Sequence, residues 1–408
     1  MNINRKLGYL ILIGILHFSV TAQNQIGNII GDNAYSGFGS TFALSGNGER
    51  IITSAPKSKK CGINCGEITI YEYVNNGWKQ LGETLLGAKS GDYFGSSIAI
   101  SDDGTRIIVS SPHSDKNGYI SGCVKVYEWS KNKWIQLGDD IYGEPKDMFG
   151  SKVKISGDGC HIAIGSPFSQ NNDFVRVYKW KNKKWIKKGQ DLKDEANSEY
   201  FGASISLSSN GNRIAFGVHN PDKIGCVKVF DFKNNKWVQI GVDLKTNNIK
   251  DGFGGSVSLS GDGNTVAIGI SKGNKLNDSQ VGIIEVFRQK NGVWLQIGGR
   301  IYGENPYDLF GQSIELSYNG NRLIGSSIFN DVHGVNSGQV RLFEYKRNSW
   351  KTTFTKNGTN ERDYLGKALS ISSKGDVISA SSTEEWLSKQ GLGSIKIFKI
   401  EEKENTKY

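Results

Sequence analysis

The dipeptide Phe-Gly recurs along the chain at nearly constant intervals, and this recurrence restricts the possible folds more than any other feature of the sequence. Its copies, counting a Leu-Gly as the seventh, begin at residues 38, 94, 149, 201, 253, 310 and 365. The intervals between them are 56, 55, 52, 52, 57 and 55 residues, and a serine follows each copy by seven residues. A period of this length indicates an array of similar structural units rather than one irregular core.

Each unit contains four short segments with the character of β-strands. They are typified by "FGSSIAIS", "HIAIGSP", "GCVKVYEW" and "KWIQLG", in which apolar and polar residues alternate between turn residues. Asn-Gly or Asp-Gly separates the first two segments in six units, and Lys374-Gly375 takes that place in the last. These dipeptides supply the positive φ angles of a tight hairpin turn.

We therefore predict an all-β fold, a seven-bladed β-propeller of four-stranded antiparallel blades. Gly, Ser and Ala in the first segment suit the innermost strand, because the blades converge at the axis. A tryptophan marks the outer strand that follows each of the first six units, whereas the seventh unit ends without one. Because "QIGNII" at residues 25–30 resembles "QIGGRI" at 296–301, we expect the N-terminal segment to supply the outer strand of the last blade.

The chain begins with the pattern of a secretory signal peptide, which we assign to residues 1–22. Arg5 and Lys6 precede an apolar run at 7–18 and "VTA" at 20–22, and that run is too short for a membrane-spanning helix. We assign residues 23–400 to the propeller and 401–408 to a charged tail. Without residues 1–22 the net charge of +10 falls to +8, which favours acidic partners unless it only keeps the surface solvated.

Five cysteines leave at least one unpaired. Cys61 and Cys65 are close enough to form a small loop disulfide, whereas Cys123 and Cys226 occupy matching strand positions and are expected to be apolar strand residues, and the state of Cys160 is open. No Cys or His pair has the spacing of zinc ligands.

Alternate connections of a propeller blade lie on opposite faces, and the longer ones share one face. We expect ligand binding on that face, because binding residues concentrate on variable loops of a rigid scaffold. Trp386 beside Glu384 and Glu385 is able to stack on a sugar ring, or alternatively to cover the blade core. The candidate ligand-binding residues are Trp386, Glu384, Glu385, His113, Asp115 and His333.

Two further charged series recur. An acidic residue precedes the Phe-Gly pair at Asp92, Asp147, Glu199, Asp251, Asp308 and Asp363. It forms either a ring of carboxylates around the channel mouth or a set of backbone caps where the chain turns into the inner strand. Lysines in the outer turns either grip an anionic polymer or protect strand edges from pairing.

No local motif predicts catalysis. Ser271 lies in a G-x-S-x-G sequence, but at the end of a predicted strand rather than in a strand-to-helix turn. His113, His219 and His333 fall in loops of different units, and carboxylates from several blades could also assemble into an active site. We expect a protein that is not an enzyme.

The segments from Phe38-Gly39 to "SAP" at 54–56, and from Phe149-Gly150 to "GSP" at 165–167, resemble the FG-GAP repeat. That resemblance implies the seven-bladed propeller of integrin α chains and related secreted proteins, which mostly act in adhesion or ligand binding. Many members of the family hold calcium in D-x-D-x-D-G loops, but the corresponding segments of this chain, such as "SDDGTR", are too short and have too few acids. We expect no cofactor and no calcium site.

The sequence thus predicts a secreted or cell-surface module that binds an extracellular protein or an anionic polysaccharide, without specific recognition of nucleic acid. A propeller-based glycan hydrolase or lyase, and a structural component of a surface layer, are the alternatives. The ligand, the oligomeric state, and glycosylation at the sequons of Asn277 and Asn357 stay open.

Overall fold

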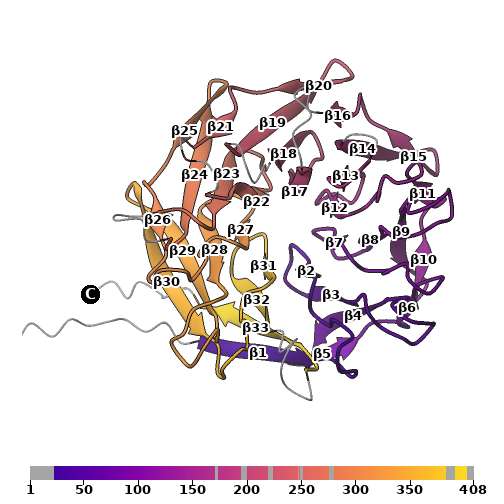
Figure 1. Ribbon diagram of the computed structural model, residues 1–408, viewed down its shortest axis with the longest axis horizontal. Helices are drawn as coiled ribbons and strands as arrows, with labels where there is room; N and C mark the ends of the chain where they lie inside the picture. Colours follow the sequence, from indigo (N-terminus) through magenta and orange to yellow (C-terminus); the bar gives the residue numbers. More distant parts are fainter. Residues whose placement is uncertain are drawn as a thin grey trace, which may run out of the picture.

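The computed structural model forms a ring of seven antiparallel sheets around a central axis (Figure 1). It describes residues 23–170, 173–193, 200–218, 224–246, 248, 251–274, 280–382 and 391–401. Within these ranges the regular elements are β-strands, and no helix is long and apolar enough to cross a membrane. Residues 1–22, the sequon at Asn277 and residues 402–408 lie outside them.

The strands of each blade follow one another outward from the axis, which confirms the predicted order. The innermost strands are β2 (Phe42–Leu44), β7 (Ile98–Ile100), β12 (Lys152–Ile155), β17 (Phe201–Leu207), β22 (Phe253–Leu259), β27 (Ile314–Leu316) and β31 (Leu369–Ile371). The second strands are β3 (Arg50–Ala55), β8 (Arg106–Ser111), β13 (His161–Ser166), β18 (Arg213–Val218), β23 (Thr265–Ile270), β28 (Arg322–Ser327) and β32 (Val377–Ser382).

The two outer layers complete the blades. The third strands are β4 (Glu67–Val74), β9 (Cys123–Ser130), β14 (Phe174–Lys181), β19 (Cys226–Lys233), β24 (Ile283–Lys290), β29 (Gln339–Lys346) and β33 (Ser394–Ile400). The outer strands are β5 (Gly77–Gln80), β10 (Lys133–Gln136), β15 (Lys184–Lys187), β20 (Lys236–Gln239), β25 (Val293–Gln296), β30 (Ser349–Asn357) and β1 (Gln23–Ile30). In five blades a two-residue strand also pairs with the third strand: β6 (Leu85–Leu86), β11 (Ile141–Tyr142), β16 (Leu192–Lys193), β21 (Leu244–Lys245) and β26 (Ile301–Tyr302).

The N-terminal strand closes the ring, as the sequence predicts. β1 pairs antiparallel with β33, from Gln23 opposite Ile400 to Ile30 opposite Ser394, and Figure 1 shows the two strands side by side. Gly27 of β1 lies against the indole of Trp78 in the first blade. Gly82, Gly138, Gly189, Gly241 and Gly298 lie against the tryptophan of the following blade in the same way. The N-terminus thus reproduces the contact that joins the other neighbouring blades.

The Phe-Gly pairs form turns rather than strand starts in five blades, where the inner strand begins three or four residues later. The glycine has a positive φ in every copy, for example 91° at Gly95 and 93° at Gly150, and in the other two blades the strand accommodates it with a register shift. The phenylalanine itself is buried between its own blade and the preceding one, where Phe94 packs with Ile52 and Ile68. The core therefore lies between the blades.

The hairpins between the first two strands differ from the prediction in one respect: only the glycine has a positive φ. The Asp or Asn before it instead caps the turn with its side chain. In the second blade the Asp103 carboxylate accepts hydrogen bonds from the Ser101 hydroxyl at 2.6 Å and the Thr105 amide at 2.9 Å. This explains the serine that follows each Phe-Gly pair by seven residues.

A closed ring of seven backbone hydrogen bonds joins these hairpins around the axis. In each bond a backbone amide donates to a backbone carbonyl, with N···O distances of 2.8–3.0 Å. The amides donate as follows: Asn47 to Asp102, Asp102 to Gly157, Asp158 to Ser209, Ser209 to Gly261, Asp262 to Tyr318, Tyr318 to Ser373, and Ser373 to Gly46. We call the face that carries this ring the turn face and the opposite one the loop face.

A cation from most blades also binds the next hairpin. Arg50 forms an ion pair with Glu72 at 2.7 Å and donates to the Gly104 carbonyl at 3.1 Å. Arg106, Arg213 and Arg322 repeat the contact to the hairpin carbonyl. In the third blade the buried His161 takes the place of arginine, and the Lys188 ammonium donates to the next hairpin instead, at 2.7 Å from the Gly211 carbonyl.

Candidate functional site

Three long loops on the loop face, between the second and third strands of blades one, two and six, share one backbone geometry. In each loop three consecutive carbonyl groups accept amides from the segment that leads into the next blade. The acceptors are Ile63, Asn64 and Cys65, then Tyr119, Ile120 and Ser121, and then Val335, Asn336 and Ser337, with N···O distances of 2.8–3.1 Å. We call this arrangement the clasp. It fixes the loops to the rigid ring even though their sequences differ.

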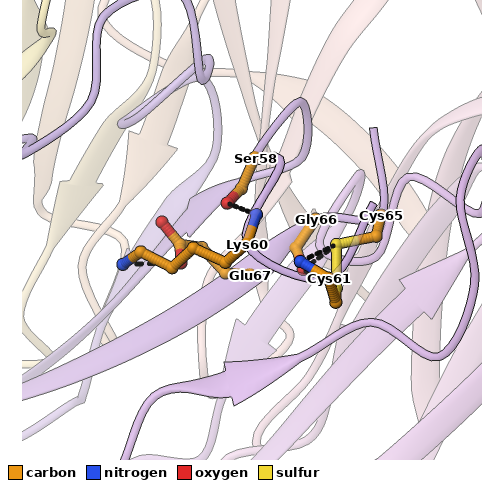
Figure 2. The surroundings of a disulfide bond; sticks show 6 residues. All are labelled: Ser58, Lys60, Cys61, Cys65, Gly66 and Glu67. Atoms are coloured by element: carbon orange, nitrogen blue, oxygen red, sulfur yellow. Dashed lines mark hydrogen bonds and ion pairs between the residues drawn. A yellow bond between two sulfur atoms is a disulfide. The ribbon is translucent and has the colours of Figure 1, made fainter. Parts of the chain in front are cut away.

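A cross-link within each loop occupies the same position but differs in chemistry. In the first loop it is the disulfide between Cys61 and Cys65, which confirms the predicted pairing (Figure 2). In the other two loops a backbone amide, that of Asn117 or of His333, donates to a serine hydroxyl at 3.2 Å. In the first loop the Cys61 amide also contacts the Cys65 sulfur at 3.2 Å, so the disulfide adds a covalent bond to the hydrogen bond of the repeated loop.

The first residue of each clasp presents an exposed apolar side chain. Ile63 is 67 % exposed, Tyr119 66 % and Val335 53 %. Other exposed large apolar residues of the loop face are Tyr35, Phe168, Ile224, Tyr307 and Val332. Because the clasp immobilises the backbone at these tips, they can contact a partner with little loss of conformational entropy.

The charged groups near the first two tips are mostly paired. Lys60 contacts the buried Glu67 at 2.9 Å and Asp32 at 3.1 Å, and Figure 2 shows Lys60 beside Glu67. The hydrogen bond to Glu67 raises the pKa of Lys60. In the second loop Asp115 lies 3.7 Å from Lys89. The tips themselves are therefore apolar, with paired charges around them.

The predicted His113 packs its ring against Tyr93, with the ring centroids 4.9 Å apart. Phe168 with Tyr200 and Phe329 with Tyr364 form the same kind of contact in other blades, at 5.5 Å and 6.0 Å. His113 thus fills an aromatic position of the repeated framework.

The predicted Asp115 and His333 also repeat contacts of other loops. Asp115 accepts a hydrogen bond from the Ile120 amide at 2.8 Å, as Asp331 does from Asn336 at 2.7 Å. Nδ1 of His333 lies 2.7 Å from the Gly358 carbonyl, just as the Asn117 side chain donates to Gly143 at 2.8 Å. Since they belong to blades two and six, the ring does not bring His113 and His333 together.

The remaining predicted candidates, Trp386, Glu384 and Glu385, lie outside the described residues, as do His219 and Glu199. The described members of the acidic series are buried, and Asp147, Asp251 and Asp363 accept hydrogen bonds from backbone amides. Asp251 accepts the Phe253 amide at 2.9 Å, and Asp363 accepts the Thr359 amide at 2.7 Å. These contacts favour the backbone caps over a ring of free carboxylates. In the described ranges no three His, Cys, Asp or Glu side chains converge on a position that could hold a metal.

The fold and the loop face define a seven-bladed β-propeller that presents loops from one side of the ring. A model of the FG-GAP repeat matches residues 86–127, which include the Phe-Gly pair of the second blade and its hairpin. The chain is thus a propeller that carries an FG-GAP repeat, as its sequence predicts. A comparison with curated protein sequences gives no significant match.

Among solved structures, the chain is similar to a Bacteroides uniformis protein described as a candidate 6-phosphogluconolactonase. The two share 11 % sequence identity with a TM-score of 0.55, over 85 % of this chain and 94 % of the other. At this identity the similarity shows a common fold alone.

Proposed function

We propose that this protein is a secreted or cell-surface binding module that recognises an extracellular protein or an anionic polysaccharide through its loop face, without turning it over. The observation that carries the proposal is the set of apolar side chains held by the clasp, above all Ile63, Tyr119 and Val335. Exposed apolar side chains gathered on one face are typical of interaction sites.

Two features support an extracellular location. The N-terminal residues have the pattern of a signal peptide. The Cys61–Cys65 disulfide suits an oxidising compartment, in which such bonds persist. The net positive charge favours acidic ligands on long-range electrostatic grounds.

A binding screen of residues 23–408 against immobilised extracellular matrix proteins and acidic polysaccharides tests the proposal. We expect Ile63→Ser combined with Tyr119→Ser to weaken binding at least tenfold, because both changes remove apolar contact area without touching the backbone clasp. Val293→Ser is the matched control, since Val293 is 54 % exposed but lies on an outer strand.

The same screen separates the alternatives. Binding to polysaccharide that falls steeply with salt concentration would identify an acidic glycan as the ligand. Turnover of a glycan, lost on changing one loop carboxylate, would contradict the proposal in favour of a hydrolase or lyase. Self-assembly without any ligand would favour a structural role in a surface layer.

A further inference from the structure

The central channel of the ring contains charged side chains that the repeat does not explain. The inner strands enclose a cavity of about 450 Å³, and its polar lining consists largely of serines. Its charged lining residues are Lys152 and Lys154 of β12, Glu315 of β27, Lys367 just before β31, and Asp102 in the hairpin after β7. A cavity of this size is typical of a site for a small molecule.

The channel is narrowed at the turn face, so a ligand would enter from the loop face. The seven backbone hydrogen bonds join the hairpins directly around the axis at that end. The Asp102 carboxylate extends over Gly157 and accepts the Ser209 hydroxyl at 3.1 Å, where a Cβ at Gly157 would overlap it. Tyr318 covers Gly261 in a similar way.

Serine hydroxyls at the inner-strand position of Lys154 have a structural role in other blades. Ser206, Ser258 and Ser370 each accept an amide of the next inner strand, at 2.9–3.1 Å. Glu315 occupies this position in the sixth blade and accepts the Ile371 amide at 3.1 Å. A lysine ammonium has no acceptor, so Lys154 cannot make this contact.

No hydrogen bond or ion pair links Lys152 or Lys154 to another described residue, although Lys154 interacts electrostatically with the Glu315 carboxylate. The Lys152 side chain is reached by water inside the channel but is surrounded by its walls, and this burial together with the charge of Lys154 lowers the pKa of Lys152. Burial likewise raises the pKa of Glu315. Two neighbouring ammonium groups that no described carboxylate contacts directly favour an anion between them.

We propose that the central channel is a binding site for a small hydroxylated anion, either a sugar acid or a sugar phosphate. Its carboxylate or phosphate contacts the ammonium groups of Lys152 and Lys154. Its hydroxyl groups contact the channel serines and the Glu315 carboxylate, which accepts hydrogen bonds but repels a second anionic group. This site is independent of the apolar tips on the loop face.

Isothermal titration calorimetry of residues 23–408 with glucuronate, glucose 6-phosphate, inorganic phosphate and glucose tests the proposal and separates the two sources of negative charge. We expect one of the two sugar anions to bind at least tenfold more tightly than glucose and than inorganic phosphate. Lys152→Ser and Lys154→Ser should each weaken that binding about tenfold, since each removes a charge-assisted hydrogen bond.

The serine variants are suited to this test because Ser204 and Ser206 occupy the same positions in the fourth blade. An unchanged midpoint of thermal unfolding verifies that they fold. Lys131→Ser, in an outer turn, is the matched control for charge and should bind like the wild type. The double variant Ile63→Ser/Tyr119→Ser should retain the wild-type affinity for the sugar anion. Failure of the loop-face proposal can therefore be distinguished from failure of the channel proposal.

Absence of binding by both sugar anions would overturn the proposal, as would an unchanged affinity of the Lys152→Ser/Lys154→Ser double variant. Inorganic phosphate bound as tightly as the sugar anions would contradict the contacts to the ligand hydroxyls.

Discussion

At the scale of single residues, His161 illustrates how a position that breaks the repeat can be structural. It follows Cys160 and the Asp158-Gly159 hairpin, a combination that suggests a reactive site when the sequence is viewed alone. The structure places it where four other blades have arginine, with Nδ1 3.7 Å from Asp158. The sequence could not reveal that Lys188 makes the contact that arginine makes in those blades. Lys188 lies far from His161 in the sequence, and its acceptor, the Gly211 carbonyl, belongs to the next blade.

In the third blade, an ion pair joins the third strand to the segment that follows the outer strand. This pair predicts that the stability of the protein depends on pH. Burial alone would raise the pKa of Asp191, but hydrogen bonds from Arg176 and Lys187 lower it to about 2. Its unfolded pKa is about 3.9, so the stabilisation is complete above that pH and is lost as the pH falls towards 2. The contribution is about 2 kcal/mol at neutral pH.

We therefore expect Asp191→Asn to be less stable than the wild type by about 2 kcal/mol at pH 7, with a difference that shrinks between pH 4 and pH 2. Urea unfolding at a series of pH values measures it. Asp139→Asn, which changes an exposed carboxylate of the second blade, is the control. A difference that stays constant down to pH 2 would argue against the pair.

At the scale of elements, the strand order follows from the sequence but the clasp does not. The loop sequences "CGINCG", "NGYISG" and "HGVNSG" have only their glycines in common. Their shared geometry depends on backbone carbonyl groups, which every residue has, so no side-chain pattern marks it. His113, Asp115 and His333 therefore look like ligand-binding candidates in the sequence, although their side chains make contacts that support the repeated loops.

The repeated loop gives a direct test of the role of the disulfide. Cys61→Asn with Cys65→Ser introduces the residues of the second loop. Loss of the disulfide should lower the free energy of unfolding by about 2 kcal/mol, and the hydrogen bond to the new serine should restore about 1 kcal/mol of it. Cys61→Ala with Cys65→Ala should lose the whole amount. Chemical denaturation compares the two variants, and equal stabilities would show that the serine does not replace the bridge.

At the scale of the whole molecule, we expect ring closure by β1 to contribute strongly to the stability of the propeller. A Cβ at Gly27 would overlap the Trp78 ring, so we expect Gly27→Ala to cost about 1–3 kcal/mol. Deletion of residues 23–31 should lower the melting temperature further, because it removes the whole pairing with β33. Differential scanning calorimetry measures both.

Gly77→Ala is the matched control for this experiment, since nothing lies within 4 Å of the added Cβ. If Gly27→Ala melted at the same temperature as Gly77→Ala, the closing contact would be unimportant for stability.

The ring and its closure could be predicted from the sequence because seven copies reinforce one pattern. The charges in the channel could not, since Lys152 and Lys154 resemble the ordinary surface lysines of an alternating strand until the ring shows that this side of the strand faces the axis.

The pairing of β1 with β33 also has a consequence for how the protein is made. The first strand of the described chain to leave the ribosome is joined to one of the last, across almost the whole length of the chain. Contacts between such distant segments form slowly, because the entropy of closing a long loop is lost before the contacts stabilise the fold. Until β33 has been synthesised, β1 has no partner strand, so this blade is completed only after the other six have been made.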